Sequence, residues 1–209
     1  MFQIWVNLPA VDKMVDPYFS MLWSHDIPKL ASTDADGRPS ELTIIAGSVP
    51  GATAPSPPPH SWASNPDSDL AIWHLHLEAG AQRTLPAANH VDTVRTLYVF
   101  SGGSVAIAGE RVSAGTGAVV RSDTPIELLD GGDGTEIMVL QGRPIGEPVA
   151  RYGPFVMNHR AEIEQAMTDY QRTRFGGWPW PTDDPNHGSN PRRFARHADG
   201  RLEEFEPAT

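Results

Sequence analysis

The sequence predicts a mainly β protein: an antiparallel β-barrel or sandwich, followed by one α-helix and an irregular tail. Two observations predict it. Glycine and proline are frequent, with 19 and 20 of 209 residues, which is typical of a chain with many tight turns. From Leu70 onward, short apolar runs alternate with Gly- and Asp-rich turns. Short strands at such regular spacing indicate an antiparallel barrel or sandwich.

The first fifty residues contain three candidate strands. Residues 2–8 alternate apolar and polar side chains and end at Pro9, so they predict a strand that needs a partner to cover its apolar edge. Residues 26–30 and 41–51 predict further short strands. The Pro-rich residues 51–62 cannot enter a sheet interior, and we place a connecting segment over residues 51–69.

The predicted barrel covers residues 70–158 and contains at least six strands. They are expected at residues 70–77, 94–100, 104–109, 117–120, 125–129 and 136–142. The turns between them are expected at residues 78–81, 101–104, 109–117 and 130–135. The run Ser101–Ser104 is Gly-rich, but no helix follows it, so it predicts a hairpin turn and not a phosphate-binding loop.

One helix is predicted over residues 159–176. Ile163, Met167 and Tyr170 recur at helical spacing, which indicates one face packed on the core. Asn158 is the expected N-cap. The tail from residue 177 to 209 is expected to be irregular.

Two tryptophans, Trp178 and Trp180, are expected to hold the tail against the body of the protein. The densest basic stretch, residues 190–197, lies in the same tail with acidic residues nearby. We interpret it as solvated or locally paired.

Composition excludes several classes of protein. The formal net charge is -10, so broad electrostatic binding of nucleic acid is not expected. There is no cysteine, which excludes disulfides, zinc–thiolate sites and thiol nucleophiles. No apolar stretch approaches ~20 residues, and the first ten residues lack the pattern of a signal peptide. The sequence therefore predicts a cytoplasmic protein.

His74, His76 and Glu78 share one face of a predicted strand, because residues two apart point the same way. One interpretation is a half-exposed strand that buries Trp73 and Leu75 and turns its polar side outward. The other is a metal site for iron, zinc or manganese, which would need a further ligand or an open position.

His90 and Asp92 precede the next long strand and form either a two-ligand fragment or part of an ordinary loop. The remaining histidines carry no pattern; they are His25, His60, His159, His187 and His197. No Ser/His/Asp arrangement is distinguished by its spacing, so no catalytic residue is assigned.

Several motifs, taken in order, resemble the pirin family. They are FQIWVNLP at residues 2–9, DKM at 12–14, DIP at 26–28, IAG at 45–47, and the long run at 146–181 that includes YGPFVMN and RFGG. The resemblance extends over nearly the entire chain.

The resemblance implies a bicupin, a pair of jelly-roll β-barrels. In this family the N-terminal barrel binds a metal, usually iron, through three histidines and one glutamate. Some bacterial members resemble quercetin 2,3-dioxygenases in activity, and eukaryotic members are linked to transcription factors as redox-dependent co-regulators. The family's metal motifs precede the strand that residues 2–9 resemble. Residues 1–50 are therefore expected to be closing strands of a first cupin, and residues 70–158 a second cupin, with no metal ligands in this chain.

General cupin ligand positions in the second barrel would fall near His90, Asp92, Arg95 and Ile126. Arginine and isoleucine do not ligate metals, so the resemblance implies a metal-free second barrel. It also supports the outward-facing interpretation of His74, which lies outside the motif.

Two functions are compatible with these observations. The first is a metal-dependent dioxygenase of the quercetinase type, inactive when this chain is alone; iron would be expected in the complete family architecture and no cofactor in this chain. The second is a non-catalytic cupin that acts as a binding or scaffold module, or as a redox-linked transcriptional co-regulator. The expected partner is a second copy or an upstream cupin, bound through Phe2–Leu8. No nucleic-acid or membrane partner is expected.

Overall fold

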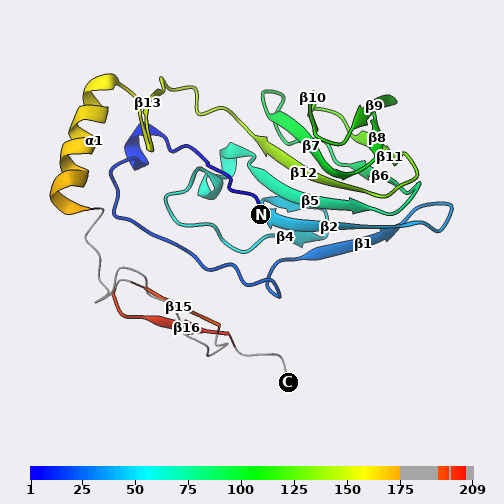
Figure 1. The fold of residues 1–209 in the computed structure, drawn as a ribbon, viewed down its shortest axis with the longest axis horizontal. Helices are drawn as coiled ribbons and strands as arrows, with labels where there is room; N and C mark the ends of the chain where they lie inside the picture. The colour runs from blue at the N-terminus through cyan, green and yellow to red at the C-terminus, as the bar shows by residue number, and fades with distance from the viewer. Residues whose placement is uncertain (175–192, 198, 206–209) are drawn as a thin grey trace. The chain divides into compact units, whose positions relative to one another are not determined.

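The computed structural model describes residues 1–174, 193–197 and 199–205. Short strands dominate this part of the chain, together with a single α-helix (Figure 1). The chain divides into two compact units. The first contains Met1–Met14 and Ser24–Gly146, and the second contains Val15–Trp23 and the described residues from Glu147 onward. Within the described ranges, no helix is long and apolar enough to cross a membrane.

The larger sheet of the first unit has six antiparallel strands in the order β1-β2-β5-β12-β7-β10. Their bounds, in that order, are Lys29–Thr33, Pro39–Ala46, Ala71–Leu77, Thr135–Gly142, Val94–Gly102 and Thr116–Val120. The ladder between β5 and β12 runs from Ala71 opposite Gln141 to Leu77 opposite Thr135. These two pairs mark the two ends of the β5–β12 ladder.

The smaller sheet has four strands in the order β6-β11-β8-β9. They are Gln82–Leu85, Ile126–Asp130, Ser104–Ile107 and Glu110–Ser113. Buried residues of both sheets belong to one hydrophobic cluster, so the sheets enclose a shared core. This arrangement is the cupin-type jelly roll that the sequence predicts.

Alternation along β5 shows why these residues form a strand. Trp73, Leu75 and Leu77 are at most 2% exposed, whereas His74 and His76 are half-buried on the other face. Burying one leucine side chain contributes about 1.5–3 kcal/mol. The inward row of β5 therefore fixes which side of the strand faces the core.

The connection between β2 and β5 contains several short regular elements. β3 (Ser48–Val49) and β4 (Ala52–Thr53) form a two-stranded ribbon, and the 3-10 turns η2 (Trp62–Ser64) and η3 (Pro66–Ser68) follow. A further 3-10 turn, η1, covers Ala10–Asp12. Residues 51–69, which were expected to be a connecting segment, contain β4, η2 and η3.

The end of the ladder beside Leu77 is held by one buried carboxylate. Asp130 is 4% exposed. Its Oδ2 accepts hydrogen bonds from the backbone N–H groups of Gly80, Gly132 and Gly134 at 2.9, 2.7 and 3.1 Å. Its Oδ1 accepts the hydroxyl of Thr135. Asp130 thus satisfies the turn at residues 131–134 and ties it to the chain after β5.

The second unit contains α1 (Arg160–Thr173) and two hairpins. The first hairpin pairs β13 (Ala150–Tyr152) with β14 (Phe155–Met157), and the second pairs β15 (Phe194–Arg196) with β16 (Leu202–Glu204). The His197 ring stacks on Phe19 with centroids 4.3 Å apart, so the second hairpin packs against the segment 15–23.

Most predicted strands are confirmed, and the exceptions are instructive. Residues 2–8 were expected to form a strand, but they form none in the structure, because no described residue pairs with their backbone. β6 was not predicted, and β9 occupies part of the run 109–117 that was expected to be a turn. Residues 26–30 contain only the start of β1.

The helix boundaries also differ from the prediction. The N-cap is His159, not Asn158, because the Glu162 carboxylate accepts the backbone N–H of His159 at 2.7 Å. The Asn158 side chain instead donates to Glu147 at 2.7 Å. The helix ends at Thr173, before the predicted boundary at residue 176.

The tail was expected to be irregular from residue 177, yet β15 and β16 form a hairpin within it. Trp178 and Trp180, which were expected to anchor this tail, lie outside the described residues.

Candidate functional site

Polar side chains enter the jelly roll where β5 begins and β12 ends. Arg95 is fully buried and Gln141 is 9% exposed. Both continue inward rows that contain buried apolar residues: Leu97 and Val99 follow Arg95 on β7, and Val139 precedes Gln141 on β12. Strand alternation therefore places a guanidinium and an amide inside the barrel.

Arg95 has two of its three nitrogens satisfied. Its Nε donates to Oε1 of Gln141 at 2.7 Å, and its Nη1 donates to the carbonyl oxygen of Pro86 at 2.8 Å. Its Cζ lies 5.5 Å from the centroid of the Trp73 ring, a cation–π distance. Neither Nη2 of Arg95 nor Nε1 of Trp73 has a hydrogen-bond partner among the described residues.

Burial lowers the pKa of the Arg95 guanidinium below its ordinary value, and the negative charge of Asp69 opposes that shift. Arginine nonetheless keeps its proton in proteins. The interior of the barrel therefore holds a permanent positive charge.

Gln141 connects this cation to Asp69. Its Nε2 donates to the backbone oxygen of Asp69 at 2.9 Å and to Oδ1 of the same residue at 3.2 Å. With Oε1 already accepting from Arg95, the amide has only one possible orientation. Asp69 itself has a left-handed backbone with φ of 48°, which is uncommon for a residue other than glycine.

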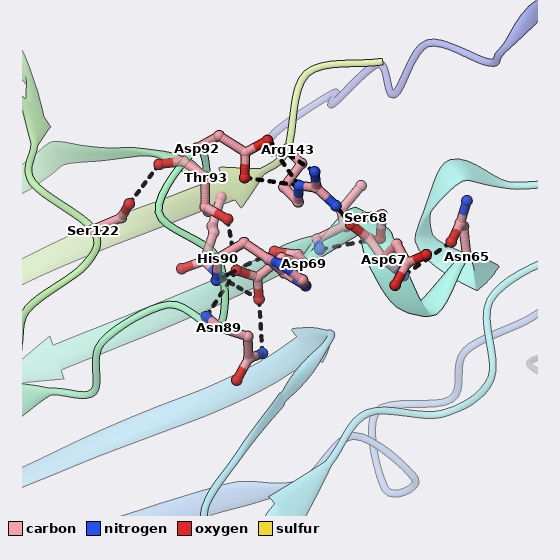
Figure 2. A network of polar contacts seen from close by, with 12 residues as sticks. Asn65, Asp67, Ser68, Asp69, Asn89, His90, Asp92, Thr93, Ser122 and Arg143 are labelled. Atoms are coloured by element: carbon pink, nitrogen blue, oxygen red, sulfur yellow. Dashed lines mark hydrogen bonds and ion pairs between the residues drawn. The ribbon is translucent and has the colours of Figure 1, made fainter. Parts of the chain in front are cut away.

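The Asp69 carboxylate is the centre of the network drawn in Figure 2. It accepts the backbone and side-chain N–H groups of Asn89, each at 2.9 Å, and the backbone N–H of His90 at 3.2 Å. The Thr93 hydroxyl donates to it at 2.6 Å, and the Ser122 hydroxyl donates in turn to the Thr93 carbonyl. The loop before β7 is thus fastened to the start of β5.

At the rim, Arg143 forms a two-pronged ion pair with Asp92, with Nε–Oδ1 and Nη2–Oδ2 distances of 2.9 Å (Figure 2). Its Nη1 donates to the Asp67 carbonyl at 3.0 Å. The hydrogen bond from Arg143 lowers the pKa of Asp92, and the same contact raises the pKa of Arg143. Both groups are held in their charged forms at the surface.

A pocket of about 280 Å³ opens beside this network. Asp69, Asn89 and Gln141 line it together with residues 53–57 of the connector. The pocket is smaller than the ~300–1,000 Å³ typical of sites for drug-sized ligands. It brings solvent next to residues that are themselves hydrogen-bonded to one another.

The structure places His74, His76 and Glu78 away from the barrel interior. Nε2 of His74 lies 3.1 Å from Oε2 of Glu136 on the outer face of the sheet. Glu78 is exposed beyond the end of β5. The interpretation of this strand as apolar inside and polar outside is confirmed by the burial of its alternate row.

The second set of candidate metal-ligand positions, near His90, Asp92, Arg95 and Ile126, is not brought together either. Asp92 is paired with Arg143, Arg95 points into the core, and Ile126 is buried at 4% exposure. His90 contributes its backbone N–H to Asp69.

The scattered histidines have separate neighbours. His25 lies 3.4 Å from Asp26, His60 lies 3.1 Å from Asp12, and His197 lies 2.7 Å from Glu203. His159 caps α1, and His187 lies outside the described residues.

The donor set does not fit the iron that the family resemblance implies. Among the residues that the structure describes, no three His, Asp or Glu side chains gather as a metal site would require. The barrel interior instead holds Arg95, whose charge would repel a cation. That this chain binds no metal remains a prediction.

Sequence reasoning missed Asp69, Gln141 and Arg143. A usable signal was present for Gln141: inward positions of β12 alternate as Ile137, Val139 and Gln141, so the amide was predictable as an interior group. Asp69 had no comparable signal, because its partners come from distant segments of the chain.

Comparison with known proteins agrees with this fold. The model of the Pirin C-terminal cupin domain matches residues 72–176. A Pseudomonas aeruginosa protein, named provisionally as a quercetin 2,3-dioxygenase, is 35% identical over 176 residues, which cover 84% of this chain and 56% of the relative. Pirin-1 of Arabidopsis thaliana is 30% identical, with 83% of this chain and 57% of the relative covered.

A solved structure shows the same likeness. The crystal structure of a quercetin 2,3-dioxygenase from Acinetobacter baumannii matches with a TM-score of 0.68 and 31% identity, over 83% of this chain and 56% of that chain. The chain thus spans a little more than half the length of the proteins it matches.

Proposed function

Because this chain belongs to the pirin family, we propose that it provides the metal-free cupin barrel of a quercetin 2,3-dioxygenase-type protein, and that it does not turn over a flavonol by itself. A dioxygenase of this kind uses a redox metal to bind substrate and activate oxygen. In this proposal the iron and its ligands belong to a different barrel.

The buried Arg95 is the observation that carries the proposal. A guanidinium that donates to Gln141 at 2.7 Å and lies over Trp73 fills the interior with a fixed positive charge. A second cation placed beside it would be strongly repelled in this low-dielectric core.

The experiment combines metal analysis with an activity assay. The purified chain, incubated with iron(II) and desalted, is measured by elemental mass spectrometry and then given quercetin in air. We expect substoichiometric metal and no loss of the flavonol absorbance. The Acinetobacter baumannii quercetin 2,3-dioxygenase, treated identically, is the control. Near-stoichiometric iron together with turnover by this chain would contradict the proposal.

A second candidate function, a non-catalytic binding module, is favoured by a separate feature. On the outer side of the larger sheet a groove of about 600 Å³ is lined mainly by apolar side chains. Grooves of this size and character are common sites of molecular recognition. Binding of this kind does not depend on whether the chain is catalytic.

A further inference from the structure

Two buried donors inside the jelly roll lack an acceptor. Arg95 and Trp73 are 0% and 2% exposed, so a further segment packed on the outside of the barrel would not reach them. Throughout the part of the chain that the structure describes, Nη2 of Arg95 and Nε1 of Trp73 have no hydrogen-bond partner. Cζ of Arg95 lies 5.5 Å from the centroid of the Trp73 ring. Buried donors are normally satisfied, so two unsatisfied donors in one place indicate a ligand that accepts from them.

The buried charge of Arg95 also lacks an opposite charge in contact with it. Nε donates to the amide oxygen of Gln141 at 2.7 Å, and Nη1 donates to the carbonyl oxygen of Pro86 at 2.8 Å. Both acceptors are neutral, and Arg95 makes no other hydrogen bond to a described residue. Buried charges in proteins are normally paired with an opposite charge. The ligand that satisfies Nη2 is therefore expected to be an anion.

Asp69 does not supply this charge directly, because its carboxylate is committed elsewhere. Oδ1 accepts the side-chain N–H groups of Asn89 and Gln141 at 2.9 and 3.2 Å. Oδ2 accepts the Thr93 hydroxyl at 2.6 Å and the backbone N–H of Asn89 at 2.9 Å. The Gln141 amide thus stands between the carboxylate and the guanidinium of Arg95. Asp69 could contact Nη2 only by giving up the bonds that hold the loop before β7.

The pocket of about 280 Å³ lies at the same end of the barrel. Gln141 on β12 stands opposite Ala71 on β5 and opposite Arg95 on β7. Ala71 and Gln141 line the pocket, and Trp73 is the next inward residue after Ala71 on β5. The pocket therefore brings small solutes to the level of the barrel at which both donors lie. Because apolar side chains of both sheets fill the core, the ligand is limited to a few atoms.

From the unsatisfied donors and the unpaired buried charge, we propose that the jelly roll binds one small monovalent anion beside Arg95 and Trp73. The anion is a halide or the carboxylate of a short organic acid. It accepts from Nη2 and Nε1, and the bond from Nη2 is strengthened by opposite charges. A single negative charge matches the single guanidinium. The site is independent of the catalytic proposal above, because it requires neither metal nor turnover.

Nuclear magnetic resonance of the isotope-labelled full chain tests the proposal, because each tryptophan indole N–H gives its own signal. Trp73→Phe identifies the Trp73 signal by removing it. Sodium formate and sodium chloride are titrated separately into a chloride-free buffer, and at least one of them is expected to move the Trp73 signal saturably. The sodium salt of a bulky sulfonate, at the same ionic strength, is expected to leave it in place. Tighter binding of formate would identify a carboxylate site, and tighter binding of chloride a halide site.

One substitution made at two arginines separates this site from general effects of salt. Arg95→Met removes the cation and is expected to weaken anion binding by at least about tenfold, as the loss of a hydrogen bond from a charged donor implies. Arg143→Met is the matched control. Arg143 lies at the same end of the barrel, but its charge is already paired with Asp92, so the Trp73 signal should respond as in the unchanged chain. Circular dichroism verifies that both variants fold.

The titration of the unchanged chain can overturn the proposal without any variant. A Trp73 signal that neither formate nor chloride moves at about 0.1 M, a concentration that saturates a site of millimolar affinity, would do so. Equal movement with the bulky sulfonate, or a response that survives Arg95→Met, would also overturn it. None of these results depends on iron or quercetin, so failure here is distinguishable from failure of the proposed function.

Discussion

The two ends of the β5–β12 ladder each centre on a buried aspartate, but the two sites differ in kind. Asp130 accepts only neutral donors, three backbone N–H groups and the Thr135 hydroxyl. Asp69 accepts neutral donors too, but Gln141 also links it to the cation of Arg95. One end is a closed turn. The other contains a fixed charge, and Nη2 of Arg95 and Nε1 of Trp73 have no hydrogen-bond partner among the residues that the structure describes.

This difference indicates how stability and chemistry are distributed in the barrel. The Asp130 carboxylate already accepts hydrogen bonds from three backbone N–H groups and the Thr135 hydroxyl. A ligand would therefore find no unsatisfied polar group at that end. Nη2 of the interior guanidinium has no acceptor among the described parts of the chain, so a donor stays available there. We therefore expect changes at the Asp130 end to act on folding alone, and changes at the Asp69 end to act on the interior electrostatics as well.

The largest effect is expected from Asp130→Ala. It leaves the N–H groups of Gly80, Gly132 and Gly134 without their acceptor, and each unsatisfied buried group costs about 1–3 kcal/mol. We expect the free energy of unfolding to fall by ~4 kcal/mol. Urea denaturation followed by circular dichroism measures it. A loss below ~1 kcal/mol would mean that water replaces the carboxylate.

At the other end, Gln141→Leu is expected to destabilise the chain more than Arg95→Met. The leucine removes the acceptor of a buried cation and the donor to Asp69, with an expected loss of ~2–3 kcal/mol. The methionine removes the cation itself and its unsatisfied Nη2, so the loss should be nearer ~1 kcal/mol. Denaturation of both variants in parallel tests this order, and the reverse order would contradict the account of Arg95.

Asp130 is one of the carboxylates that make the stability of the fold depend on pH. Burial raises its pKa, but the hydrogen bonds from Thr135 and the three glycines outweigh burial and hold the pKa below the ordinary 3.8. A carboxyl whose pKa is lower in the folded state stabilises the fold above its unfolded pKa, and that stability is lost as pH falls through the folded pKa.

We therefore expect the free energy of unfolding to decline below about pH 4, and less steeply in Asp130→Asn. Urea titrations at several pH values compare the two slopes. Equal slopes would show that Asp130 does not contribute to acid sensitivity.

The smallest effect is expected from Arg143→Gln. The ion pair with Asp92 is solvent-exposed, with side chains 31% and 54% exposed, and such pairs contribute little because water and salt screen them. We expect the urea midpoint to stay within experimental error at 0.15 M salt. A clear shift that disappears at high salt would show that the rim pair stabilises the polar end.

The predictability of the fold from sequence follows the same division between the two ends. The turn at residues 131–134 and the strands on either side are signalled by local composition, so residues 130–135 and 136–142 were correctly expected to be turn and strand. The alternation of β5 similarly fixed the inward row of Trp73, Leu75 and Leu77. Local patterns suffice where the deciding contacts are close in sequence.

The polar end could not be predicted in this way. Asp69 forms hydrogen bonds with Asn89 and Gln141, which are 20 and 72 residues away. No local sequence pattern predicts contacts over such distances. The expected strand at residues 2–8 failed for a related reason, because alternation shows that a segment can pair but not that a partner is present. β9 was not predicted because the glycines on both sides of it indicate a turn.

The single orientation of the Gln141 amide has a consequence for the evolutionary history of this barrel. Its oxygen serves Arg95 and its nitrogen serves Asp69, so replacing any one of the three leaves a buried group of the others unmatched. A lineage could not exchange this cation for a metal ligand one residue at a time without passing through less stable intermediates. The three positions should therefore be inherited and replaced as a set.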